Sequence, residues 1–299
     1  MRSDAVSRTE LLGAQLLAKL RPQQLLHSYV RRAARQGLQR TYFILSFDCD
    51  TERDIEVVGD LHDRLRSLGI TPVYAVPGAL LEKGADAFRA VAATGAEFIN
   101  HGYAVHTLYR SGTAEWESTL FYDRLPAEAV VEDIKRGHEA IVSVLGAIPA
   151  GFRVPHFGTF QRPEHLTLLH DTLSEMGYRY SSSTLPLTGL LRGPARRVRN
   201  DLWEIPVSGC FDNPLQILDS WSFRFAPGAR SAGREGEYRV QMEKMLEFFS
   251  DSRPGLLNYY ADPSQVHDWD DFFRCMEKAA PIAIGSYREL IDILESAGD

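Results

Sequence analysis

From residue 41 onward, the chain alternates short apolar runs with longer stretches in which apolar residues recur at helical spacing. The runs predict strands and the stretches between them predict helices, two of which end at Gly69 and Gly177. Strands are expected near residues 41–48, 71–76, 97–100, 151–154, 178–182, 203–207, 256–260 and 282–284. Helices are expected near residues 54–68, 84–94, 126–145, 163–176, 235–250 and 264–279, with a last helix at the end of the chain.

Repeated alternation of strand and helix is typical of an α/β protein with mostly parallel strands and helices outside. Seven or eight such units favour an irregular (β/α) barrel of about seven strands over an open sheet. No repeat or linker interrupts the pattern, so we expect one barrel domain over residues 41–299. In such barrels the chemistry gathers at the carboxyl ends of the strands.

Residues 1–40 precede this pattern and predict an N-terminal helical extension. Leucines recur at helical spacing between residues 9 and 36, and Pro22 breaks the run. The extension could cover one end of the barrel or form a dimer contact, and we favour the first interpretation. A homo-oligomer is compatible with the sequence.

Composition narrows the class of protein. The chain is 44% hydrophobic and 24% charged, as in ordinary globular proteins. A net charge of −7 without a basic stripe argues against a nucleic-acid partner. No run approaches 18 apolar residues, so no membrane span is expected. Three scattered cysteines and the lack of an apolar run at the start of the chain predict a reducing, cytoplasmic location.

Two carboxylates close the first predicted strand. Asp48 and Asp50 are two residues apart and therefore share a face, whereas Cys49 points to the opposite face. Two like charges at the end of a buried strand are costly unless a cation lies between them. The pair therefore indicates a divalent metal, and a solvated loop is the alternative.

Two histidines follow the third predicted strand. His101 and His106 are five residues apart, and Gly102 gives the backbone between them the freedom to bring both onto one metal. Imidazole and carboxylate ligands together suit zinc, and they also accept iron, cobalt or nickel. A pair of loop histidines alone is weak evidence for a metal site, and the acidic pair Asp48 and Asp50 strengthens it.

Three further residues are candidates at later strand ends. Arg153 leaves a strand into a Pro/Gly turn, where its fork could clamp a carboxylate or form a surface salt bridge. His156 either faces the pocket or packs on Phe157. Asp262 ends a strand before Pro263, so helix capping is its default interpretation and catalysis the alternative.

Together these motifs resemble the polysaccharide deacetylase superfamily, which shares the NodB homology domain. The resemblance runs from about Phe43 to the last helix. It rests on Ser46-Phe47-Asp48-Cys49-Asp50, the segment from His101 to His106, Gly151-Phe152-Arg153-Val154-Pro155, and the closing Ile284-Gly285-Ser286-Tyr287-Arg288-Glu289-Leu290. The first motif is similar to that of deformylases acting on lipid-linked aminosugars.

The resemblance implies a metal-dependent hydrolase that removes an acetyl or formyl group from an amine. It implies that Asp50, His101 and His106 bind the metal. It also implies that Asp48 is the general base and that Arg153 orients Asp48. The expected substrate is a small N-acylated aminosugar, which could be nucleotide- or lipid-linked.

This sequence departs from the family pattern at two places. The family usually spaces its two histidines four residues apart, whereas here the spacing is five. Where the family usually has a general-acid histidine before proline, this chain has Asp262, so either Asp262 or His156 would supply the proton. These departures leave two alternatives open: a catalytically impaired binding protein, and a hydrolase of cyclic amides or ureides.

Overall fold

The structure, a computed structural model, describes residues 6–113, 115–226, 236–249 and 253–297. Its centre is an eight-stranded sheet in the order β10-β1-β2-β3-β6-β7-β9-β8. Neighbouring strands are parallel except β8 and β9, so seven strands run in one direction. The strands of this sheet are β1 (Thr41–Asp48), β2 (Val73–Val76), β3 (Phe98–Asn100), β6 (Gly151–Phe152), β7 (Tyr180–Ser181), β8 (Arg196–Arg197), β9 (Trp203–Glu204) and β10 (Gly255–Ala261).

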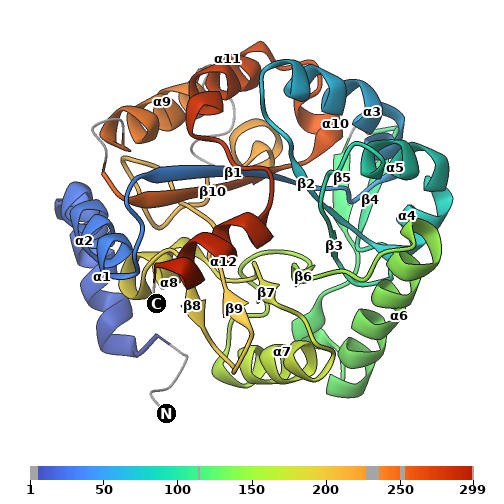
Figure 1. Ribbon diagram of the computed structural model, residues 1–299, viewed down its shortest axis with the longest axis horizontal. Helices are drawn as coiled ribbons and strands as arrows, with labels where there is room; N and C mark the ends of the chain where they lie inside the picture. Colours follow the sequence, from blue (N-terminus) through green and yellow to red (C-terminus); the bar gives the residue numbers. More distant parts are fainter. Residues whose placement is uncertain (1–5, 114, 227–235, 250–252, 298–299) are drawn as a thin grey trace.

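Most helices surround the sheet on its outer side, whereas the last helix, α12 (Tyr287–Ser296), lies across the middle of the ring in this view (Figure 1). The α-helices are α1 (Arg8–Leu20), α2 (Pro22–Arg35), α3 (Glu52–Ser67), α4 (Gly78–Lys83), α5 (Ala85–Ala92), α6 (Ala127–Leu145), α7 (Pro163–Glu175), α8 (Pro186–Arg192), α9 (Glu237–Phe249), α10 (Pro263–Val266), α11 (Asp270–Ala279) and α12 (Tyr287–Ser296). Short 3₁₀ turns lie at Tyr122–Arg124 and Ala280–Ile282, and a π-helical turn lies at Trp221–Phe225. Among the described residues, no helix combines the length and apolar character needed to cross a bilayer.

The sheet curls until its two ends approach each other. Beyond β9, the backbone N–H of Ser208 donates to the carbonyl of Asn258 in β10 at 2.8 Å. The N–H of Asn258 donates in return to Ser208 Oγ at 2.9 Å. A ring of seven parallel strands thus closes at a seam that holds hydrogen bonds but no strand ladder. This confirms the irregular (β/α) barrel expected from the sequence.

The residues of β1 alternate between the two faces of the barrel wall. Phe43, Leu45 and Phe47 belong to the outer core, which the helices cover. Tyr42 and Ile44 face the interior and pack in a second cluster with residues of α12. Because α12 fills the amino-terminal end of the barrel with apolar side chains, the open end is the carboxyl end, where the predicted site lies.

Several sequence-based boundaries need correction. The strand expected near 282–284 is a single bridge between Ala283 and Phe43, since a 3₁₀ turn occupies Ala280–Ile282. The helix expected near 264–279 is interrupted and forms α10 and α11. The antiparallel hairpin of β4 (Thr107–Arg110) and β5 (Glu115–Ser118) was not expected. The ends of the helix expected near 235–250 lie outside the described residues.

The N-terminal extension covers the barrel only in part. In α2, Leu25, Leu26 and Tyr29 are buried in the outer core, as expected. In α1, by contrast, alanines face the protein, and the leucines expected to cover the core are exposed: Leu11, Leu12, Leu16, Leu17 and Leu20. The division into an extension over 1–40 and a barrel domain over 41–299 stays a prediction.

Helix α6 packs closely against the loop that follows β3. Gly137 of α6 lies against this loop, so that a Cβ added there would overlap Asn100 Oδ1 and the carbonyl of Gly102. Gly59, in the middle of α3, has nothing within 4 Å of its added Cβ. The same substitution at these two helical glycines should therefore have opposite effects.

We predict that Gly137→Ala lowers the free energy of unfolding by about 1–3 kcal/mol, because the extra methyl group overpacks the contact. Gly59→Ala, the matched control, should raise it by about 0.5–1 kcal/mol, because alanine has the higher helix propensity. Urea denaturation followed by circular dichroism measures both. Equal effects of the two variants would contradict the close approach.

Candidate active site

A cavity of about 330 Å³ opens at the carboxyl ends of the strands. Residues from five separate segments line it, and most of the predicted site residues are among them. The wall is formed by Asp48, Asp50, Thr107, Trp116, Ser118, Phe121, His156, Phe157, Thr159, Ile217, Asp219, Trp221, Ser222, Tyr260, Asp262 and Gln265. Asp48 and Asp50 both reach the cavity while Cys49 is buried in the outer core, as their alternation along the strand predicts.

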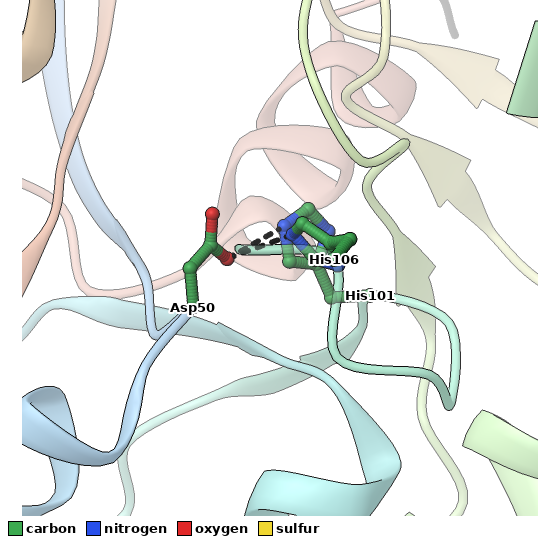
Figure 2. A group of neighbouring side chains, drawn as sticks. All are labelled: Asp50, His101 and His106. Atoms are coloured by element: carbon green, nitrogen blue, oxygen red, sulfur yellow. Dashed lines mark hydrogen bonds and ion pairs between the residues drawn. The ribbon is translucent and has the colours of Figure 1, made fainter. Parts of the chain in front are cut away.

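Asp50 from the segment after β1 meets His101 and His106 from the loop after β3 (Figure 2). Asp50 Oδ1 lies 3.3 Å from His101 Nε2 and 3.0 Å from His106 Nε2. One ligand atom from each residue lies within 4.8 Å of the other two. Both histidines are buried, and their rings meet edge to face with centroids 4.7 Å apart.

The hydrogen bonds of His101 show that this trio suits a cation. His101 Nδ1 lies 2.8 Å from the backbone carbonyl of Arg153, which can only accept, so Nδ1 carries the proton. In the neutral ring, Nε2 then directs a lone pair at Asp50 Oδ1, which also has only lone pairs to offer. A cation between the two atoms removes this conflict, and the Asp/His/His donor set fits a divalent metal.

The electrostatics of the trio agree with this fit. Burial acts to raise the pKa of Asp50, but His106 and His101 outweigh it and hold that pKa well below its usual range. Burial acts to lower the pKa of His101, but the hydrogen bond to Asp50 and the charges of Asp48 and Asp50 raise it above its ordinary value. Both shifts describe a site that favours added positive charge.

The loop between the two histidines is held from α6. Asp133 accepts hydrogen bonds from the backbone N–H groups of Tyr103 at 3.1 Å and Ala104 at 2.9 Å, and from Tyr122 Oη at 2.6 Å. Gly102 has a φ of 77°, and a Cβ there would overlap Asp133. A fixed loop, rather than a helix, therefore brings both histidines to Asp50, which accommodates the five-residue spacing.

Arg153 holds Asp48 from inside the barrel. Its Nη1 donates to Asp48 Oδ1 and to Ser46 Oγ, both at 2.7 Å. Its Nη2 donates to Tyr287 Oη at 2.7 Å and to Ser182 Oγ at 3.2 Å, and its Nε donates to the Ser182 carbonyl at 3.3 Å. All five N–H groups are thus used.

Arg153 is fully buried, so the surface salt bridge considered from the sequence is wrong. The expected two-bond clamp is also absent, because one hydrogen bond joins Arg153 to Asp48. Burial acts to lower the pKa of Arg153, but the charge of Asp48 outweighs it and raises that pKa, so the guanidinium stays charged. The other carboxylate oxygen, Asp48 Oδ2, is not bound by Arg153 and lies 4.0 Å from His101 Nε2.

A second buried pair, which sequence reasoning missed, supports Arg153 from behind. Glu204 of β9 accepts from the backbone N–H groups of Ser183 and Thr184, both at 2.9 Å. It also lies 3.1 Å from His170 Nε2 of α7. These bonds fix the segment after β7 that contains Ser182, an acceptor for Arg153. The serine-rich segment was visible in the sequence, but its carboxylate partner was not.

His156 lies at the cavity wall, which answers one question left open by the sequence. Its Nε2 is 3.1 Å from the carbonyl of His106, and its ring lies against Phe121 with centroids 4.8 Å apart. Burial, followed by the charge of His106, lowers the pKa of His156 to about 4. A neutral imidazole in this position packs against the loop of His106.

Asp262 occupies the N-cap position of α10, yet its side chain makes no capping hydrogen bond. The capping interpretation is therefore wrong, and the side chain lines the cavity with Asp48 and Asp50. Burial, followed by the charges of Asp50, Asp54 and Asp48, raises the pKa of Asp262 well above its ordinary value. Asp219, a further carboxylate missed by sequence reasoning, accepts from Tyr260 Oη at 2.8 Å in the same wall.

Solved structures with a similar arrangement of strands and helices include proteins described as polysaccharide deacetylases. The chain matches no family model and no curated protein. Among solved structures, it is similar to a protein described as a polysaccharide deacetylase from Mycobacterium smegmatis, with a TM-score of 0.61 and 18% identity. That alignment covers 88% of this chain and 91% of the other.

Two further structures are similar at 12% identity, each with a TM-score of 0.57. One is described as a polysaccharide deacetylase from Pseudomonas aeruginosa PAO1, and the other is Puue allantoinase. Each alignment covers 86% of this chain and 89% of the other. At these identities the likeness shows the fold alone, and it confirms the fold that the resemblance to the polysaccharide deacetylase superfamily implies.

The Glu204–His170 pair predicts how stability depends on pH. Burial acts to raise the pKa of Glu204, but the hydrogen bond and charge of His170 outweigh it, so the folded pKa lies below the ordinary 4.5. The stabilisation is complete above 4.5 and is lost as the pH falls through the lower, folded value. We expect Glu204→Gln to lower the free energy of unfolding at neutral pH by about 3 kcal/mol.

The same variant should lose less stability than the wild type below pH 4.5. Glu56→Gln, on the exposed side of α3, is the control and should change neither the stability nor its pH dependence. Denaturant unfolding over a series of pH values measures both. An unchanged acid slope in Glu204→Gln would contradict the assignment.

Proposed function

We propose that this protein is a metal-dependent amide hydrolase that removes an N-acetyl or N-formyl group from an aminosugar or a similar small N-acylated molecule. The observation that carries the proposal is the convergence of Asp50, His101 and His106 beside Asp48. A divalent cation held by the trio, zinc by preference and iron, cobalt or nickel as alternatives, would supply Lewis-acid activation of the amide carbonyl and of water.

Asp48 is the general base in this proposal. Arg153 engages one of its oxygens, and the other is directed toward the trio. The buried guanidinium fixes the orientation of Asp48, so the free oxygen can take a proton from the attacking water. Arg153 is a positioning residue, because it acts through Asp48.

Asp262 is the general acid for the leaving amine. Its raised pKa favours the protonated form, and the side chain faces the same cavity as Asp48. A carboxyl group kept neutral by its surroundings can donate a proton at neutral pH, where an ordinary aspartate cannot. His156 is the less suitable donor, because its lowered pKa leaves it unprotonated.

The cavity wall supports a sugar-like substrate. Trp116, Trp221 and Tyr260 provide apolar faces on which a sugar ring can pack, and the aspartates provide hydrogen-bond acceptors. The fold likeness to proteins described as polysaccharide deacetylases supports the same class. The three free, buried cysteines suit the reducing, cytoplasmic location expected from the sequence.

A cyclic amide or ureide is the alternative substrate, and the fold likeness to an allantoinase supports it. Purified protein loaded with zinc or cobalt should therefore be assayed on N-acetyl and N-formyl aminosugars, free and nucleotide- or lipid-linked, and on allantoin. Release of acetate or formate supports the proposal. Ring opening of allantoin alone favours the alternative, and inactivity on every substrate with metal bound favours a binding protein.

We predict that Asp48→Asn lowers turnover by about 10²–10⁴-fold while the bound metal stays stoichiometric, since the base is lost and the trio is intact. His101→Ala should lose the metal, because one of three ligands is removed. His156→Ala, the matched histidine control, should keep it. Elemental analysis and turnover under saturating substrate measure these effects. Near wild-type turnover in Asp48→Asn would refute the base assignment.

We predict that Asp262→Ala lowers turnover by about 10²-fold or more without a loss of stability, because a repelled carboxyl group is removed. Ser286 is the control, since its Oγ accepts from the backbone N–H of Glu289 at 3.0 Å and caps α12. Ser286→Ala should cost about 1 kcal/mol of stability with turnover intact. The reverse pattern, a less stable but fully active Asp262→Ala, would show that Asp262 acts as a cap.

A further inference from the structure

Helix α1 presents a row of leucines to solvent. Leu12, Leu16 and Leu20 follow each other at intervals of four residues and are 65%, 60% and 66% exposed. Leu11 and Leu17 flank this row and are 36% and 38% exposed. Large apolar side chains scattered singly on a surface need no explanation, whereas a contiguous row on one helix indicates a contact surface.

The leucine row, defined as Leu12, Leu16 and Leu20, belongs to a helix that is fixed to the protein. Ala14 and Ala18, on the opposite side of α1, are buried. Arg192 of α8 binds Glu10 through two hydrogen bonds, at 2.6 and 3.0 Å. Because these contacts already bury the other face of α1, turning the leucines inward would break them.

Charge is distributed unevenly along the chain. Residues 1–40 contain eight lysines and arginines against two acidic residues, a net charge of +6. Because the whole chain carries −7, the remainder carries −13. The segment that bears the leucine row is thus strongly basic, although the protein is acidic.

The basic residues of this segment lie around α1 and α2. Arg8 and Lys19 are next to the leucine row on the surface of α1, since helical spacing places Arg8 beside Leu12 and Lys19 beside Leu16. Arg31 and Arg35 are exposed on α2. In the described part of the chain, none of these four has a carboxylate within ion-pair distance. An anionic partner of α1 would therefore find positive charge without a carboxylate partner at Arg8 and Lys19, beside an apolar surface.

We propose that α1 docks on an anionic lipid surface, with the leucine row inserted at the level of the headgroups and the basic residues paired with lipid phosphates. Exposed leucines next to arginine and lysine are the composition of helices that lie in the membrane interface. With 13 residues, α1 is about 20 Å long and shorter than the hydrocarbon core of about 30 Å, so it lies along the surface.

A second copy of the chain fits this surface less well. A two-fold symmetric contact places the same patch on both sides, so the +6 segments of two copies would face each other. Anionic lipid supplies the opposite charge. The distribution of charge therefore favours the lipid surface over self-association through α1.

Vesicle co-sedimentation of the full chain tests the proposal. We expect binding to vesicles of equal parts phosphatidylglycerol and phosphatidylcholine, weaker binding to phosphatidylcholine alone, and a decline with added salt. The triple variant Leu12→Gln, Leu16→Gln, Leu20→Gln should bind at least about tenfold more weakly. The matched control Val142→Gln, Ile148→Gln, Val240→Gln removes three exposed apolar side chains elsewhere and should bind as the wild type does.

Removing charge gives an independent test. Arg31→Gln with Arg35→Gln should weaken binding to the anionic vesicles by about fivefold per charge and reduce the salt dependence. Circular dichroism and sedimentation velocity without lipid check that each variant is folded and report its oligomeric state. No binding to anionic vesicles at low salt would overturn the proposal, as would equal binding by the two triple variants. A wild-type dimer that the leucine variant converts to a monomer, without lipid binding, would assign the row to a second copy.

Discussion

The buried guanidinium of Arg153 is the interaction on which the site depends. Placing a charge inside a protein costs several kcal/mol unless its donors are satisfied, and here acceptors from β1, the segment after β7 and α12 use all five. The backbone carbonyl of the same residue accepts from His101 Nδ1. One residue thereby fixes both the carboxylate proposed as base and the tautomer of an imidazole proposed as ligand.

The sequence predicted those elements of the fold that a local pattern of apolar residues defines. The apolar run of β1 and the helical spacing of α6 lie where the sequence places them, because β1 is buried on both faces and α6 buries one face against the barrel. The hairpin of β4 and β5 was missed, since its residues are largely exposed and carry little apolar pattern. Conversely, the apolar residues near 282–284 suggested a strand, but Ala283 alone bridges to Phe43.

The sequence predicted those residues of the candidate site that lie at the ends of strands. Parallel strands end at the same rim, so residues at or just after their ends, such as Asp48, His101 and Arg153, meet there. The partners that hold these residues were out of reach, because Asp133 and Glu204 act through contacts between distant segments. The leucines of α1 carried the helical spacing of a buried face, and their exposure depends on which face the rest of the protein occupies.

The seam at Ser208 and Asn258 affects how the cavity of such a barrel can change in shape. A full ladder ties the diameter of a barrel to its strand number and stagger. Here a few hydrogen bonds without a ladder close the ring, and the connection over residues 209–226 brings Asp219 and Trp221 to the cavity. Changes in that connection would reshape one wall while the histidine loop on the other side keeps its register. The scaffold thus allows the shape of the cavity to change without disturbing the residues proposed to act on the substrate.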